Sequence, residues 1–202
     1  MDLYDTYLAA RVRASDATLP GRVALVITER DLLEQGAYDT MAAFLEWAFD
    51  FGASAVVVYV SVLDEEAVPT LRREFEAVDA PVPVAVRDPA DDQRAEAPVQ
   101  VSIGLGGKHE LAAAIRDIAQ DVAAGDLTPE EVTEEAIEDR LVFPSAPDLV
   151  IKTGAERLSD FMIWQSVYSE LYFTDVNWRN FRRRDYLRAL RDYQTRQRRF
   201  GQ

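Results

Sequence analysis

The chain has 202 residues, 48% of them hydrophobic, which is enough for one domain with a full core. Its formal net charge of −14 repels nucleic acid and anionic membranes over long range, so no nucleic-acid partner is expected. There is no cysteine, no apolar run near the roughly 18 residues that span a bilayer, and no signal peptide, so we expect a cytoplasmic protein without disulfides.

The charge is distributed unevenly. Almost all cations are arginines, since lysine occurs only at Lys108 and Lys152, and the arginines are concentrated near the carboxyl end. The acidic remainder is either a binding surface or, as we favour, a solvated shell typical of halophilic archaeal proteins. The arginine-rich end is the one place where an anionic ligand or an acidic partner would bind. Peripheral contact with a membrane surface is a further alternative, without an assigned site.

Strand and helix patterns alternate along the first half of the chain. Short apolar runs predict buried strands at 22–27, 54–60 and 82–86. Apolar residues at helical spacing predict helices at about 1–16, 38–51 and 65–78. Residues 28–31 read as the loop that follows the first strand, and the acidic stretch 88–97 reads as an exposed loop.

The second half continues the alternation. Strands are predicted at 99–103, 148–151 and 171–174. Helices are predicted at 111–124, from Thr128 onward, at 160–169 with Ser159 as its N-cap, and from about 182 into an arginine-rich tail that ends at 202. No repeat or linker divides the chain, so we expect a single domain over residues 1–202.

This alternation predicts an α/β fold with a mainly parallel central sheet covered by helices on both faces. In such sheets, ligands bind beyond the carboxyl ends of the strands. Several polar or glycine-rich positions follow predicted strands and should therefore lie along one edge: Thr28, Ser61, Gly104 to Gly107, and Lys152 to Ser159. Two cations, a hydroxyl and a helix start after the strand at 148–151 have the chemistry of an anion site.

The stretch 148–175, DLVIKTGAERLSDFMIWQSVYSELYFTD, also resembles the cis-prenyltransferases, the family of undecaprenyl diphosphate synthase. The resemblance extends to Gly106-Gly107, to Trp178 and Phe181, and to the terminal Arg198-Arg199-Phe200-Gly201. It is strong from about Val99 to the end and much weaker before. It implies an α/β cis-prenyltransferase fold and the Mg²⁺-dependent condensation of isopentenyl diphosphate with an allylic diphosphate.

The resemblance also implies roles for residues of the carboxyl half. Lys152, Arg157 and Ser159 would contact isopentenyl diphosphate, and Glu170 would help bind Mg²⁺. Arg199 and Gly201 match a terminal motif that reaches a neighbouring subunit's active site. The alternatives are a surface ion pair for Arg157 and a plain helix cap for Ser159. Lys152 replaces a family arginine, and lysine cannot form a bidentate fork with phosphate.

The amino half departs from the family. Thr28 stands where the family has a metal-binding Asp, and a neutral hydroxyl cannot balance a Mg²⁺-diphosphate. Glu29 replaces a glycine that should approach phosphate, and Asp31 adds a second negative charge. The segment 65–98 is shorter than the family's tunnel-forming helix and its neighbours. These losses resemble the non-catalytic, Nogo-B-receptor-like subunit of heteromeric cis-prenyltransferases, which serve the synthesis of lipid glycan carriers such as dolichol.

The expected partner is therefore a homologous catalytic subunit in a heterodimer, or a second copy in a homodimer. We expect the aromatic residues of the carboxyl half to contact it: Trp164, Tyr172, Phe173 and Trp178. An ordinary core role is the alternative for them. Two further functions stay open: a self-sufficient short-chain enzyme with Glu29 or Asp31 as a displaced metal ligand, and a non-enzymatic scaffold. The lone His109 is either a catalytic base or, as favoured, a surface or capping residue.

Overall fold

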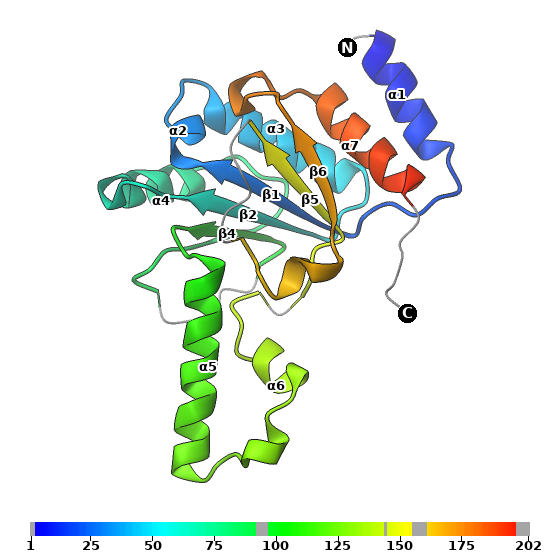
Figure 1. Cartoon of the computed structure of the whole chain (residues 1–202). Coiled ribbons are helices and arrows are strands. Elements are labelled where there is room, and N and C mark those ends of the chain that lie inside the picture. The colour runs from blue at the N-terminus through cyan, green and yellow to red at the C-terminus, as the bar shows by residue number, and fades with distance from the viewer. Residues whose placement is uncertain (1–2, 92–96, 144, 155–160, 197–202) are drawn as a thin grey trace.

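A central sheet of six strands organises the computed structural model, which describes residues 3–91, 97–143, 145–154 and 161–196 (Figure 1). The strands are β1 Arg22–Thr28, β2 Ala55–Ser61, β3 Val84–Arg87, β4 Val99–Ile103, β5 Leu149–Thr153 and β6 Glu170–Thr174. Their order across the sheet is β3-β4-β2-β1-β5-β6, and every neighbouring pair is parallel. The predicted α/β fold with a parallel sheet is confirmed.

One face of the sheet is covered by helices α1 Leu3–Arg13, α2 Glu29–Leu32, α3 Ala37–Asp50, α4 Val68–Glu76 and α7 Arg183–Thr195. Alternate strand residues such as Val23, Leu25 and Ile27 point into this layer and form the larger hydrophobic core. At its centre the ring of Phe44 packs edge-on against Trp178, Phe181 and Tyr186. This core holds β1, α3 and α7 in fixed positions.

The opposite face carries a smaller core, which includes Val26, Tyr59, Phe143 and Met162. Helix α5 Gly107–Ala124 begins against this face and then extends away from the sheet, followed by the short helix α6 Glu134–Glu138 (Figure 1). We call residues 107–141 the arm. The helix begins at Gly107, earlier than predicted, because Gly106 takes an extended N-cap conformation.

Four short 3-10 helices complete the secondary structure of the described residues: η1 Glu65–Ala67, η2 Pro129–Glu131, η3 Gln165–Tyr168 and η4 Trp178–Asn180. The helix predicted at 160–169 was wrong in its described part, where only η3 forms after turns at 161–164. The loop predicted at 28–31 was also wrong, because Thr28 caps α2 there. Over the described ranges, none of the helices has the length and apolar character needed to cross a membrane.

Candidate functional site

Strand register brings the predicted site residues to one edge of the sheet. Thr28 pairs with Ser61, and Ile103, which precedes the glycine-rich segment, pairs with Val60. Lys152 pairs with Val26, two residues before the end of β1. The prediction that these positions share the carboxyl edge is confirmed.

Thr28 is the last residue of β1 and the N-cap of helix α2, and its polar groups are hydrogen-bonded within this cap. Its hydroxyl donates to Oδ2 of Asp31 at 2.7 Å, and its backbone N–H donates to the same oxygen at 3.2 Å. In return the N–H of Asp31 points to the Thr28 hydroxyl oxygen at 3.4 Å, which completes a capping box. The Thr28 hydroxyl and one oxygen of the Asp31 carboxylate are therefore hydrogen-bonded to each other.

Glu29 is buried, and its carboxylate holds the loop that follows the neighbouring strand. One oxygen, Oε2, accepts the backbone N–H groups of Leu63 at 2.9 Å and Asp64 at 3.0 Å. Two N–H donors to one carboxylate form charge-assisted bonds, which are stronger than bonds between neutral groups. The Glu29 side chain, expected to repel a phosphate at this position, thus accepts two backbone N–H groups of the loop after β2.

These residues do not fit a Mg²⁺-diphosphate site. Both carboxylates near Thr28 are engaged by the protein itself, and Thr28 offers a hydroxyl that is already bonded. Across residues 3–91, 97–143, 145–154 and 161–196, no group of three or more His, Cys, Asp or Glu side chains could hold a metal ion. A divalent ion bound to diphosphate is best held by carboxylate oxygens, whereas in this corner one oxygen of each carboxylate is bonded to the protein and Thr28 is neutral.

Lys152 lies at the carboxyl edge but is 2% exposed. Its Nζ donates to the carbonyl oxygen of Thr153 at 2.5 Å, on the same face of the sheet as Val26. This buried cation near the carboxyl end of β5 is the part of the predicted diphosphate cradle that lies within the described residues. Arg157, Ser159, Arg199 and Gly201 lie outside the described residues.

Glu170 lies at the opposite edge of the sheet. It is the first residue of β6 and pairs with Leu149, which pairs in turn with Val23 near the start of β1. Its Oε2 is 3.3 Å from Nη1 of Arg196. Glu170 and Thr28 therefore cannot share a metal ion within one chain, and a role for Glu170 in Mg²⁺ binding requires ligands from another chain.

The predicted interface residues separate into two groups. Trp178 is 0% exposed, and its indole N–H donates to the carbonyl of Ala37 at 2.9 Å. The prediction that Trp178 contacts a partner was wrong, because it fills the larger core beside Phe44. Tyr172 is half-buried against the same core, whereas Phe173 on the outer strand β6 is 57% exposed.

Trp164 is partly exposed and borders an open hollow of about 220 Å³ between α6 and η3. Its indole N–H donates to Oε1 of Glu138 on the arm at 3.2 Å. Large apolar side chains are exposed on this side of the molecule: Ile163, Val167, Tyr168 and Phe173. We call these four residues and Trp164, all between positions 163 and 173, the β6-edge patch, and exposed apolar side chains of this kind are typical of interaction sites.

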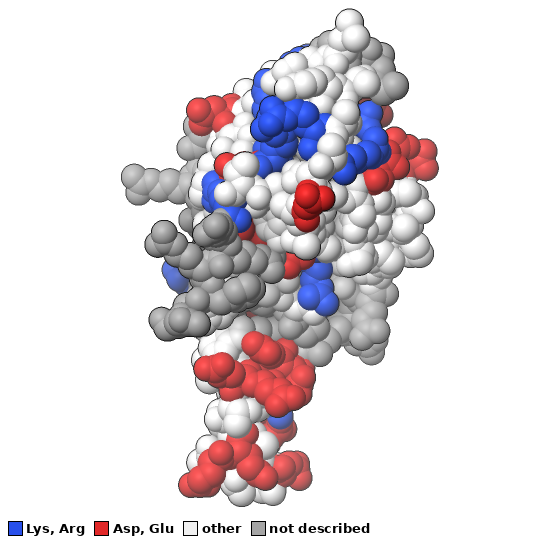
Figure 2. All heavy atoms as spheres, turned by 90° about the vertical axis from the view of Figure 1, so that its right-hand side faces the viewer, with Lys and Arg blue, Asp and Glu red and all other residues white. Residues whose placement is uncertain are grey.

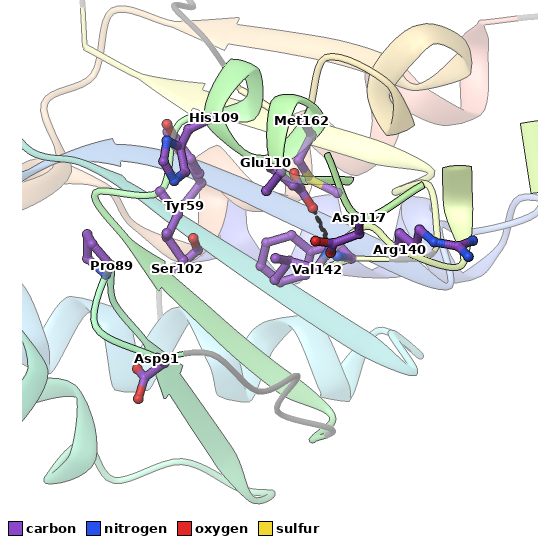
Figure 3. A pocket seen from close by; sticks show the side chains of 13 residues that line it. Tyr59, Pro89, Asp91, Ser102, His109, Glu110, Asp117, Arg140, Val142 and Met162 are labelled. Carbon is purple, nitrogen blue, oxygen red and sulfur yellow. Dashed lines mark hydrogen bonds between the residues drawn. The ribbon is translucent and has the colours of Figure 1, made fainter. Parts of the chain in front are cut away.

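A cavity of about 350 Å³ between the sheet and α5 was not predicted (Figure 3). His109 and Glu110 line it from α5, and Tyr59 and Ser102 line it from β2 and β4. His109 is exposed at this cavity, which leaves both alternatives for it open. The only sequence signal for the cavity was the position of His109 and Glu110 after the glycines of the carboxyl edge.

Glu110 joins the arm to the rest of the cavity wall. Its Oε1 accepts the backbone N–H of Val142 at 2.7 Å, that of Phe143 at 3.3 Å, and Nε2 of Gln165 at 3.2 Å. Burial raises the pKa of this carboxyl group above its ordinary value, and the hydrogen bonds only partly oppose that rise. Glu110 therefore fixes the arm against the segment that leads into β5.

Comparison with known proteins identifies the family. Residues 75–201 match the family model described as "Putative undecaprenyl diphosphate synthase". A tritrans,polycis-undecaprenyl-diphosphate synthase (geranylgeranyl-diphosphate specific) from Pyrococcus abyssi is 32% identical over 247 aligned residues, which cover 99% of this chain and 93% of the relative. This chain belongs to the cis-prenyltransferase family. The alignment is longer than the chain, so the relative has segments that this family member lacks.

The similarity is concentrated in part of the chain. An enzyme of the same name from Methanocaldococcus jannaschii is 51% identical over 109 residues, which cover 51% of this cis-prenyltransferase-family chain but only 39% of the relative's length. Among solved structures, lavandulyl diphosphate synthase from Lavandula x intermedia superposes with a TM-score of 0.76 at 24% identity, covering 91% of this chain and 99% of that one. That likeness shows a shared fold.

Proposed function

We propose that this chain is the non-catalytic subunit of a heteromeric cis-prenyltransferase, which condenses isopentenyl diphosphate with an allylic diphosphate for lipid glycan-carrier synthesis. The observation that carries the proposal is the corner after β1. There Thr28 and Asp31 bond to each other, and Glu29 is held by the N–H groups of Leu63 and Asp64. One oxygen of each carboxylate in this corner is thus bonded to the protein, and Thr28 supplies only a neutral hydroxyl where a metal-bound diphosphate needs a charged ligand as its leaving charge develops.

The shortened amino half supports the same proposal. Helix α4 spans nine residues, Val68–Glu76, and packs Leu71 and Phe75 fully into the core. The relative from Pyrococcus abyssi aligns over more positions than this chain has residues. A polyprenyl chain needs a long apolar channel, and a short helix with its apolar side chains in the core offers little wall for one.

The chain's contribution to the complex would come from its carboxyl half. Lys152 at the sheet edge, with Arg157 and Ser159 from the segment that follows, would form a cradle for isopentenyl diphosphate. Arg199 and Gly201 would reach the catalytic partner's active site. The β6-edge patch would contact that partner through Trp164 and Phe173.

Co-expression tests the proposal. The partner is a homologue from the same genome that has a carboxylate at the position of Thr28, and geranylgeranyl diphosphate is the first primer to try, because several relatives are named for it. With Mg²⁺ and labelled isopentenyl diphosphate, we expect the pair to turn over at least about tenfold faster than either chain alone. An Arg199→Ala variant should still form the complex but lower its turnover.

Two results would overturn the proposal in different directions. Ordinary turnover by this chain alone would favour the self-sufficient enzyme, in which Glu29 or Asp31 binds the metal as a displaced ligand. A stable complex without any gain in turnover would favour the scaffold. Size-exclusion chromatography with light scattering separates complex formation from activity in the same samples.

A further inference from the structure

Helix α1 has apolar residues on both of its long sides. Leu8, Ala9 and Val12 are buried against α7 and the larger core. On the opposite side Leu3 is 88% exposed and Tyr7 is 53% exposed, and Ala10 continues the line at helical spacing. A surface helix normally exposes a polar face to water. This outward apolar stripe is therefore a surface that a lipid bilayer or another molecule would cover.

Arginines surround this stripe. Helix α1 and the segment 178–196 together contain nine arginines and three aspartates, in a chain whose net charge is −14. Figure 2 shows the cations gathered over this end of the molecule, with a few carboxylates beside them. Two guanidinium groups lie over the tyrosine rings of α1: Arg11 is 5.8 Å from the centre of Tyr7, and Arg188 is 5.7 Å from that of Tyr4.

An open hollow lies beside Tyr4, between α1 and the start of α7. Its volume is about 460 Å³, and Asn177, Asn180, Arg184 and Arg188 supply donors to it. The wall also contains Asp175 and Asp185, of which Asp185 is buried and accepts Nη1 of Arg188 at 3.1 Å and the N–H of Arg182 at 3.0 Å. Asp185 is thus paired with Arg188, Asp175 adds one exposed carboxylate, and the donors of Asn177, Asn180 and Arg184 suit a phosphate group.

The far end of the molecule has the opposite charge. The arm contains ten acidic residues and three Lys or Arg residues. Figure 2 shows these carboxylates gathered at the bottom of the view, remote from the arginines over α1 and α7. A plane of negative charge would attract one end of the chain and repel the other, so the charge distribution itself sets an orientation.

We propose that the outward stripe of α1 and the arginines around it form a docking surface for a bilayer that contains anionic phospholipids. We call it the α1–α7 surface. Leu3 and Tyr7 would enter the headgroup region, Tyr4 would lie at its border, and Arg11, Arg184 and Arg188 would contact lipid phosphates. A second copy of this chain is a poor occupant, because a twofold contact would place arginines against arginines.

Vesicle sedimentation with the purified full chain tests the proposal. The vesicles are phosphatidylcholine alone or phosphatidylcholine with about 30% phosphatidylglycerol, in about 0.1 M salt, where charge attraction reaches about 10 Å. We expect at least about tenfold tighter binding to the anionic vesicles, and loss of that difference in about 1 M salt. The test needs no enzymatic activity, so it stands or falls separately from the proposed function.

Matched variants assign the binding to this surface. Arg11→Glu with Arg184→Glu should weaken binding to anionic vesicles at least about tenfold. The control, Arg73→Glu with Arg116→Glu, makes the same charge change at exposed positions of α4 and α5 and should change binding less than about threefold. Leu3→Ser with Tyr7→Ser should weaken binding while leaving the charge unchanged, and thermal unfolding checks that every variant is folded.

Several outcomes would overturn the proposal. The parent chain could bind both kinds of vesicle equally well, or bind neither. The variants of the α1–α7 surface and the control variant could also lose the same amount of affinity for anionic vesicles. Binding to single-stranded nucleic acid without binding to vesicles would assign the surface to another polyanion and would also overturn it. Concentration-dependent dimerisation that Leu3→Ser with Tyr7→Ser abolishes would assign the stripe to a second copy instead.

Discussion

At the scale of single residues, Trp178 shows how one residue type serves two roles that a sequence pattern cannot separate. An aromatic residue in the carboxyl half suits a partner surface and a core equally well. The structure decides, because the tryptophan is fully enclosed, its ring stacks on Phe181 and its N–H is bonded to Ala37. Phe173, only five residues earlier, is exposed on the outer strand.

Replacing Trp178 with alanine should therefore destabilise the chain strongly. We expect the free energy of unfolding to fall by about 3–5 kcal/mol, since the change opens a cavity and leaves the Ala37 carbonyl without its donor. Urea unfolding followed by circular dichroism measures this. Phe173→Ala is the matched control and should cost less than about 1 kcal/mol. Similar losses for the two variants would mean that Trp178 is not in the core.

Thr28→Asp tests whether the missing carboxylate alone explains the proposed lack of activity. The new side chain would face the Asp31 carboxylate that now accepts the Thr28 hydroxyl, so we expect about 1 kcal/mol of lost stability. We also expect turnover of the purified chain to stay at background. Adding Asp31→Asn removes the repulsion and should recover stability but not turnover. Strong turnover by either variant would show that the rest of the site is intact.

At the scale of elements, the strands were easier to predict than the helices around the site. Buried parallel strands have continuous apolar composition, so β1, β2, β4 and β5 stand out in the sequence. The short helix α2 did not, because its cap is built from Thr28 and Asp31 in a stretch that reads as polar loop. The segment before β6 also read as a helix from its spacing but forms turns and η3 instead.

The contact between the arm and the sheet should depend on pH through Glu110. Its pKa is raised above the ordinary value of 4.5 by burial, so the folded state holds this proton more tightly than the unfolded state does. As pH rises from about 4.5 towards neutrality, the ionisation of Glu110 therefore lowers the free energy of unfolding. Glu110→Gln keeps the acceptor oxygen for Val142 and removes the ionisation.

We therefore expect Glu110→Gln to gain stability relative to the parent chain as pH is raised from about 4.5 to 7. Urea unfolding at several pH values measures the difference between the two proteins. The matched control is Glu130→Gln on the same arm, which is exposed and should show a flat difference. A flat or falling difference for Glu110→Gln would mean that burial does not raise its pKa.

At the scale of the whole molecule, the sequence predicted the parallel sheet and the carboxyl edge at which Thr28, Ser61 and Lys152 lie. It did not predict which of the side chains at that edge can contact a ligand. Pattern and register place Thr28, Ser61 and Lys152 together. Whether a carboxylate faces a ligand or a loop depends on contacts between distant segments, as when Glu29 binds the N–H groups of Leu63 and Asp64. The cavity lined by His109 and Glu110 depends on the angle at which the arm leaves the sheet.

Two exposed apolar surfaces of the described residues differ in the charge that surrounds them. The stripe on α1 lies among arginines, whereas the β6-edge patch lies beside the acidic arm, where Glu134 and Glu138 border the hollow at Trp164. A bilayer with anionic lipids suits the first surface and is repelled by the second. A protein partner with cations at the rim of an apolar contact suits the second. The proposed subunit partner and the proposed membrane would thus meet different ends of one chain.

Phe173→Asp should therefore weaken the complex with the catalytic partner and leave vesicle binding intact. A charge placed in the apolar centre of an interface is desolvated without a partner, so we expect at least about tenfold weaker association. Titration of the labelled partner measures the affinity, and unfolding curves should change little because Phe173 is exposed. Leu63→Asp changes an exposed leucine in the loop after β2, and this control variant should associate normally. If Leu63→Asp weakens the complex and Phe173→Asp does not, the partner binds near the carboxyl edge of β1 and β2 rather than at the β6-edge patch.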